Sequence, residues 1–87
     1  MYEVLLQPDA QKVYINAEKA LAKKIARCLQ QLEQTPRLHP NIKALQGDYA
    51  GYYRYRIEDY RVIYSIEDEL AQVFVVAIAH CGEAYAP

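Results

Sequence analysis

The sequence predicts an α+β fold in which two N-terminal helices pack on a small, mainly antiparallel four-stranded sheet. Three observations lead to this prediction: a long amphipathic segment of helical period, two alternating segments joined by a tight turn, and a short segment that is apolar throughout. The expected order is strand, helix, helix, strand, strand, strand, and helices covering one sheet face are the compact arrangement for it. Because the chain has only 87 residues, we expect one domain over residues 1–87.

The first strand and the first helix are expected within the first fifteen residues. The segment Met1–Gln7 is typical of a strand, and Pro8 ends it. Asp9 is expected to cap a short helix over Ala10–Ile15, because its carboxylate can accept a hydrogen bond from the first helical N–H groups.

The second helix is the clearest element of the sequence. Asn16 is expected to cap it and Ala17–Gln34 to form it, before the Thr35-Pro36 pair stops it. Its apolar residues recur at helical spacing and form one stripe, which consists of Leu21, Ile25, Cys28, Leu29 and Leu32. Since Cys28 belongs to this stripe, we interpret it as a small core residue rather than a reactive thiol.

A loop and three strands complete the predicted fold. The loop spans Arg37–Ala50 and contains His39, which we interpret as structural or incidental rather than catalytic. A hairpin follows, with strands over Tyr52–Ile57 and Tyr60–Ile66. The last strand, Gln72–Ala79, is apolar on both faces, as expected of a central strand that is covered on both sides.

The hairpin is predicted to place three arginines on one sheet face. With a two-residue turn at Glu58-Asp59, Arg56 lies opposite Arg61, and the alternation of side chains puts Arg54 on the same face. Like charges opposite each other destabilise a sheet by up to about 1 kcal/mol, so the pattern indicates an anion bound between them. The planar guanidinium group suits phosphate. The alternative interpretation is a solvated face whose arginine stems cover apolar neighbours.

Composition limits the classes of partner and of compartment. The formal net charge is −1, so any binding of nucleic acid must come from a local patch. The longest apolar run, Val73–Ala79, is far shorter than the roughly 20 residues of a membrane span, and no signal peptide is evident. We therefore expect a cytoplasmic protein with no membrane association and with Cys28 and Cys81 reduced. Two cysteines without ligand spacing do not make a zinc site, and we expect neither metal nor cofactor.

Several segments resemble those of a known family. They are Lys43–Gly47, Gly51–Ile57, Asp59–Tyr64 and Val75–His80, followed by Tyr85. Together they resemble the RelE/ParE superfamily, the toxins of bacterial toxin–antitoxin modules, over nearly the whole chain. The resemblance implies an α+β fold and a co-expressed antitoxin that wraps the toxin in a hetero-oligomer. The RelE branch implies cleavage of messenger RNA in the ribosomal A site, and the ParE branch implies inhibition of DNA gyrase.

The resemblance also implies roles for individual residues. Arg54 and Arg56 match basic strand positions, and Arg61 matches an arginine that contacts the scissile phosphate. Tyr85 matches a C-terminal tyrosine near the active site. We expect Arg54, Arg56 and Arg61 to stabilise the phosphate during cleavage as preorganised positive charge. Lys43, Arg54 and Arg56 are the residues that we expect to bind RNA.

Cleavage of RNA also needs groups that move protons. An arginine is a poor general base because its pKa lies above about 12, so the candidates are His80, Tyr85 and, more remotely, Lys43. His80 has the best unperturbed pKa for neutral pH, although it is equally well interpreted as a strand-end histidine bonded to a backbone carbonyl. Many family members carry an arginine after the last strand, where this chain has Cys81. The predicted function is a ribosome-dependent mRNA endoribonuclease. The alternatives are a gyrase inhibitor and a toxin that only binds its antitoxin.

Overall fold

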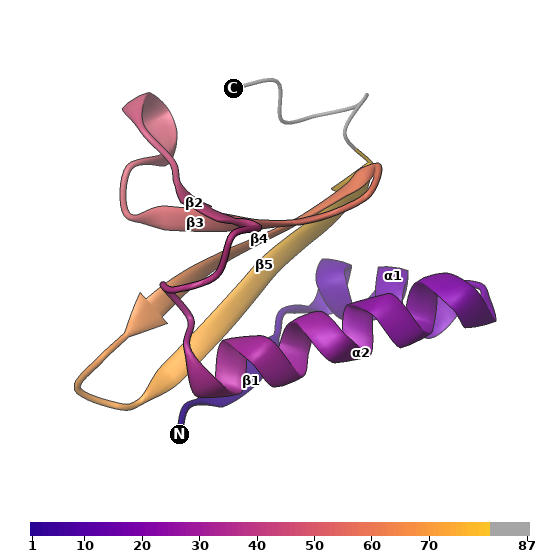
Figure 1. Ribbon diagram of the computed structural model, residues 1–87, viewed down its shortest axis with the longest axis horizontal. Coiled ribbons are helices and arrows are strands. Elements are labelled where there is room, and N and C mark those ends of the chain that lie inside the picture. The colour runs from indigo at the N-terminus through magenta and orange to yellow at the C-terminus, as the bar shows by residue number, and fades with distance from the viewer. Residues whose placement is uncertain (81–87) are drawn as a thin grey trace.

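A computed structural model describes residues 1–80 and shows two helices packed on one face of a five-stranded sheet (Figure 1). The elements are β1 Glu3–Leu6, α1 Pro8–Asn16, α2 Lys19–Gln34, β2 Ile42–Ala44, a single 3-10 turn η1 at Gly47–Tyr49, β3 Tyr52–Ile57, β4 Tyr60–Glu67 and β5 Gln72–His80. The strand order is β1-β5-β4-β3-β2. Within residues 1–80, no helix combines the length and the apolar content needed to cross a bilayer.

The predicted fold class is confirmed, but the predicted four-stranded sheet is wrong. The fifth strand, β2, lies in the segment that we expected to be a loop, where Ile42 pairs with Tyr55 of β3. A strand of three residues is too short to show an alternating pattern, and only its hydrogen bonds to β3 reveal it. The sheet is also mixed, because β1 pairs in parallel with β5 while the other three pairings are antiparallel.

Both helices begin at residues other than those predicted. Helix α1 begins at Pro8, which suits the first helical position because its fixed φ is helical and its missing N–H would have no partner there. Helix α2 begins at Lys19 with Glu18 at the cap position. The predicted caps Asp9 and Asn16 are therefore wrong, and neither helix has a side-chain hydrogen bond at its N-cap.

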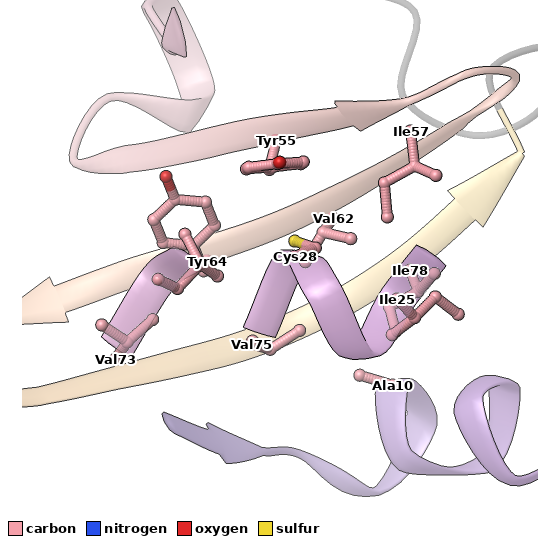
Figure 2. Packing of buried hydrophobic residues seen from close by; sticks show 11 residues of the cluster. Ala10, Ile25, Cys28, Tyr55, Ile57, Val62, Tyr64, Val73, Val75 and Ile78 are labelled. Atoms are coloured by element: carbon pink, nitrogen blue, oxygen red, sulfur yellow. The ribbon is translucent and has the colours of Figure 1, made fainter. Parts of the chain in front are cut away.

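The core lies between α2 and the three central strands (Figure 2). The predicted stripe of α2 supplies Ile25, Cys28 and Leu32, which are fully buried against residues such as Val62 and Val75. Burial raises the pKa of the Cys28 thiol to about 12, because an apolar site disfavours the thiolate. The interpretation of Cys28 as a core residue is confirmed.

Tyr64 fastens the segment after α2 to the sheet. Its hydroxyl donates a buried hydrogen bond of 2.7 Å to the carbonyl oxygen of Pro36. Its ring stacks on Tyr53 with centroids 5.8 Å apart. Burial also raises the pKa of Tyr64, so the hydroxyl stays protonated and remains a donor. The segment between α2 and β2 is thus attached to the sheet directly after the end of the helix.

We expect Tyr64→Phe to lower the free energy of unfolding by about 1–2 kcal/mol, because it leaves the buried Pro36 carbonyl without its donor. Urea denaturation followed by circular dichroism measures the loss. Tyr52→Phe is the matched control, since Tyr52 is a partly exposed tyrosine of β3 outside this contact. Equal losses in the two variants would contradict the anchoring role of the Tyr64 hydroxyl.

Candidate functional site

The structure confirms the predicted hairpin register. Arg56 lies opposite Arg61, and Arg54 lies opposite Ile63, with Ile57 and Tyr60 closing a two-residue turn. Because side chains alternate along each strand, the three arginines share the sheet face that points away from the helices. We call this face, with Arg54, Arg56, Arg61 and their neighbour on β2, the arginine face.

That neighbour is Lys43, which the short strand β2 brings onto the same face. Lys43 lies opposite Arg54 in the β2–β3 register, so cations from three adjacent strands gather on the arginine face. Ile63 lies at the centre of this face and is only 2 % exposed, so other side chains cover it. The apolar stems of the long charged side chains can provide this cover while their charged ends reach the solvent.

Backbone carbonyl groups orient two of the arginines. The Arg54 Nη1 atom donates a hydrogen bond of 2.7 Å to the Asn41 carbonyl, and the Arg56 Nε atom donates one of 3.3 Å to the Glu58 carbonyl. The Nε atom of Arg61 is buried. A carbonyl carries no formal charge, so these bonds hold the guanidinium groups in place without cancelling their charge.

His39 supports this arrangement from the loop before β2. Its ring stacks on Tyr55 with centroids 5.0 Å apart, and its Nδ1 atom accepts a hydrogen bond of 3.1 Å from the Asn41 N–H group. The Asn41 carbonyl in turn accepts the bond from Arg54 and a backbone bond of 3.0 Å from Arg56. His39 therefore has a structural role, which is one of the two interpretations that the sequence left open.

A groove of about 620 Å³ lies against the arginine face. Lys43, Arg54 and Arg61 line it together with Asp48 and Tyr49 of the η1 turn. Its described lining therefore contains three cationic side chains and one carboxylate. The groove combines positive charge, a proton acceptor and an aromatic ring in one place.

The contribution of Asp48 and Tyr49 to the groove was not predicted from the sequence. The signal that could have found them is the pair Gly47 and Gly51, which bracket the two residues and have positive φ angles of 67° and 95°. Glycine adopts this left-handed conformation without steric cost, so two such residues four positions apart indicate a compact turn. That turn places the residues between them at the edge of the arginine face.

His80, a predicted proton-transfer residue, does not lie on the arginine face. His80 pairs with Tyr60 at the end of β5, and the two rings meet edge to face with centroids 5.2 Å apart. Tyr60 is on the helix side of the sheet, as its partner Ile57 is, so His80 lies on the face opposite Arg61. Cys81 and Tyr85, another of the predicted proton-transfer residues, lie outside the described residues.

An irregularity in β5 causes this placement. From Tyr64 towards the β4–β5 turn, Tyr64 pairs with Val75, whereas Ile63 pairs with Ala77, so Val76 is an extra residue in β5. A bulge of this kind reverses the side-chain alternation beyond it. Without it, His80 would point to the arginine face and Ile78 would leave the core.

Comparison with known proteins identifies the family. A family model described as the ParE toxin of the type II toxin-antitoxin system parDE matches residues 4–85. The chain belongs to the ParE toxin family. It is a toxin of a type II toxin–antitoxin system within the RelE/ParE superfamily, as its motifs indicated. No curated protein sequence matches the chain significantly.

Solved structures of such toxins share the fold. The archaeal RelE–RelB complex from Pyrococcus horikoshii OT3 is 26 % identical with a TM-score of 0.80, over 95 % of this chain and 98 % of that one. The RelBE2 toxin–antitoxin complex from Mycobacterium tuberculosis is 22 % identical with a TM-score of 0.78, over 91 % and 96 %. The YoeB–YefM complex from Staphylococcus aureus is 20 % identical with a TM-score of 0.76, over 98 % and 99 %.

A second hollow of the toxin, about 690 Å³, lies on the helix side between α1, α2 and the β3–β4 turn. Its lining mixes apolar residues with charges of both signs, among them Lys12, Glu18 and Asp59. An ion pair between Lys24 and Glu58 spans it. Because its lining carries charges of both signs, this hollow has no preference for anions, whereas the groove carries more positive than negative charge. Within residues 1–80, no three potential metal ligands gather at one place.

A polar network lies on the helix side, away from the groove, and is structural. Arg37 forms a two-pronged ion pair with Asp68, with nitrogen–oxygen distances of 3.0 and 2.8 Å. Arg37 also donates to the Tyr53 hydroxyl at 3.2 Å, and the Tyr2 hydroxyl donates to Asp68 at 2.9 Å. These hydrogen bonds hold the pKa of Asp68 below, and that of Arg37 above, the ordinary values. The network joins the loop after α2 to the β4–β5 turn.

We expect Asp68→Asn to destabilise the toxin at neutral pH but not in acid. The pKa of Asp68 is lower in the folded state, so its contribution is present above the ordinary aspartate pKa of about 4 and is lost as the pH falls through the lower folded value. Urea denaturation of both proteins between about pH 2 and 7 measures the difference. Glu69→Gln removes a carboxylate of the same turn and is the control. A difference that grows towards low pH would contradict this linkage.

Proposed function

We propose that this toxin is a ribosome-dependent mRNA endoribonuclease that inhibits translation. The observation that carries the proposal is the arginine face, where Arg54, Arg56 and Arg61 share one side of the sheet and Lys43 joins them. Three of these four cations line one groove. Like charges that face each other on a sheet are destabilising. An anionic ligand such as the RNA backbone would offset this repulsion and would explain why the cations lie together.

The proposed reaction is attack of a 2′-oxygen on the adjacent phosphorus, with departure of the 5′-oxygen. Negative charge builds on the phosphate oxygens as the pentavalent state forms. Arg54 and Arg61 line the groove and offer fixed positive charge to those oxygens, which can stabilise the transition state by a few kcal/mol. Arg56 lies directly opposite Arg61 and completes the positive field.

Proton transfer is assigned to groups that line the groove. Asp48 brings a carboxylate, which can accept a proton from the 2′-hydroxyl, and Lys43 brings an ammonium group, which can donate one. His80 faces the other side of the sheet and is not assigned this role. Tyr85 keeps the role that the family resemblance implies.

Delivery by the ribosome agrees with the charge of the toxin. A protein of net charge −1 attracts free RNA weakly over long distances. A local cluster of cations can nevertheless bind a phosphate group that another assembly presents at short range. This favours mRNA held on the ribosome over free RNA as the substrate.

Two features favour alternatives. The matching family model is that of the ParE toxin, and the ParE branch implies a gyrase inhibitor. The position after the last strand is Cys81 rather than arginine, which favours a toxin without catalysis.

Primer extension on cellular mRNA after brief expression of the toxin distinguishes the ribonuclease from these alternatives. Cuts within translated codons support the ribonuclease. Unbroken mRNA, together with inhibited supercoiling by purified gyrase, supports ParE-like action.

We also propose a cognate antitoxin as the protein partner in the cytoplasm. The solved relatives from Pyrococcus horikoshii, Mycobacterium tuberculosis and Staphylococcus aureus are toxin–antitoxin complexes. An acidic segment of the antitoxin would complement the arginine face, and an amphipathic segment would suit the helices.

Arg61→Ala is expected to abolish growth inhibition and mRNA cleavage, because it removes a positive charge that lines the groove. Arg61→Lys should retain a small part of the activity, since it keeps the charge but loses the planar fork. Growth after induction and primer extension measure the two effects, with circular dichroism to check the fold. Arg27→Ala, which removes the same charge from the exposed surface of α2, is the control. Wild-type toxicity of Arg61→Ala would contradict the proposed site.

His80→Gln should change the rate of single-turnover cleavage on programmed ribosomes by less than a few-fold, because the side chain lies on the other sheet face. Asp48→Asn should slow cleavage by roughly 10²–10⁴-fold, the range for loss of a general acid or base. The two variants serve as controls for each other. A severe defect in His80→Gln together with a mild one in Asp48→Asn would reverse the assignment.

A further inference from the structure

We propose that Tyr49 is a stacking platform for a nucleobase of a single-stranded RNA whose phosphate lies between Arg54 and Arg61. This inference rests on the proposed function and specifies how the groove recognises its substrate. The three residues line the same groove. An RNA strand that places a phosphate on the two arginines would therefore bring an adjoining base within reach of the Tyr49 ring.

The exposure of Tyr49 sets it apart from the other aromatic residues. Its relative exposure is 38 %, and it is the one aromatic residue among the exposed large hydrophobic residues of the described chain. The other tyrosines of residues 1–80 are buried or half-buried, and several belong to the core or pack on it. A partly exposed aromatic ring beside a cluster of cations combines the two features that bind single-stranded nucleic acid.

The turn that carries Tyr49 is held in place by backbone hydrogen bonds. The Tyr49 N–H group donates to the Gln46 carbonyl at 3.3 Å, the Ala50 N–H group to the Gly47 carbonyl at 3.1 Å, and the Leu45 N–H group to the Tyr52 carbonyl at 2.9 Å. A bonded turn holds the backbone that carries the ring before the ligand binds, so less backbone entropy is lost on binding.

Stacking also suits the lining of the groove better than recognition of phosphate alone. Asp48 adds a negative charge next to Tyr49, and this charge disfavours a ligand that is only an anion. A nucleotide gains from the ring as well as from the arginines. Every base has a π face, so the platform tolerates different sequences.

The alternative is that Tyr49 only covers an apolar neighbour such as Leu45, which lines the same groove. If Tyr49 only covers apolar side chains, leucine would replace it adequately, because leucine keeps the apolar bulk. Phenylalanine would replace tyrosine both in covering and in stacking, since it keeps the ring. Tyr49→Leu and Tyr49→Phe therefore distinguish stacking from covering.

The test compares two RNA tetranucleotides that carry 2′-fluoro groups and cannot be cleaved. One contains 2-aminopurine at an internal position, and the other is abasic at that position. Affinity is measured by fluorescence anisotropy with a terminal dye, and stacking by quenching of the 2-aminopurine. Thermal unfolding checks that each variant is folded.

Wild type and Tyr49→Phe should bind the 2-aminopurine strand roughly 5- to 150-fold more tightly than the abasic strand, with quenching. Tyr49→Leu should bind both strands with the lower affinity and without quenching. A Tyr49→Leu variant that keeps the full preference for the base would overturn this inference and leave the phosphate site intact. If wild type and Arg61→Ala bind both strands equally weakly, the phosphate site fails, and the inference fails with it.

Discussion

Burial of one face of the sheet against α1 and α2 determines the chemistry of the other face. Once residues such as Val62 and Tyr64 point into the core, the alternation of side chains forces Arg54, Arg56 and Arg61 to point away. The repulsion between facing arginines costs up to about 1 kcal/mol, whereas each buried core side chain contributes about 1.5–3 kcal/mol. The core therefore holds the cations together before any anion binds, as preorganised stabilisation requires.

The bulge in β5 determines which side chains of this strand point to each face of the sheet. Val73 and Val75 precede the bulge and Ile78 follows it, yet the side chains of all three residues point into the core. The same shift sends His80 to the helix side, where it meets Tyr60. Packing of Ile78 and the direction of His80 are thus linked, because a reversal of one would reverse the other.

The segment between α2 and β3 forms much of the groove, and its successive residues contribute in different ways. Tyr64 and the Arg37–Asp68 pair fasten its beginning. His39 and Asn41 connect its middle to Arg54, and the two glycines bend its end so that Asp48 and Tyr49 stand beside the cations. A chain of net charge −1 thereby obtains a local site with more positive than negative charge. Such a site acts at short range, which agrees with a substrate brought by a larger assembly.

The features that depend on local periodicity and on turn length could be predicted from the amino-acid sequence. These are the α+β class, the α2 stripe with Cys28 in the core, and the register that joins Arg54, Arg56 and Arg61 on one face. Four other features became evident only in the folded structure. They are the short strand β2, the parallel pairing of β1, the side on which His80 lies, and the position of Asp48 and Tyr49 in the same groove as Arg54 and Arg61. A two-residue turn defines its own strand pairing, whereas a bulge or a three-residue strand depends on packing and on hydrogen bonds to other elements, which leave no local pattern in the sequence.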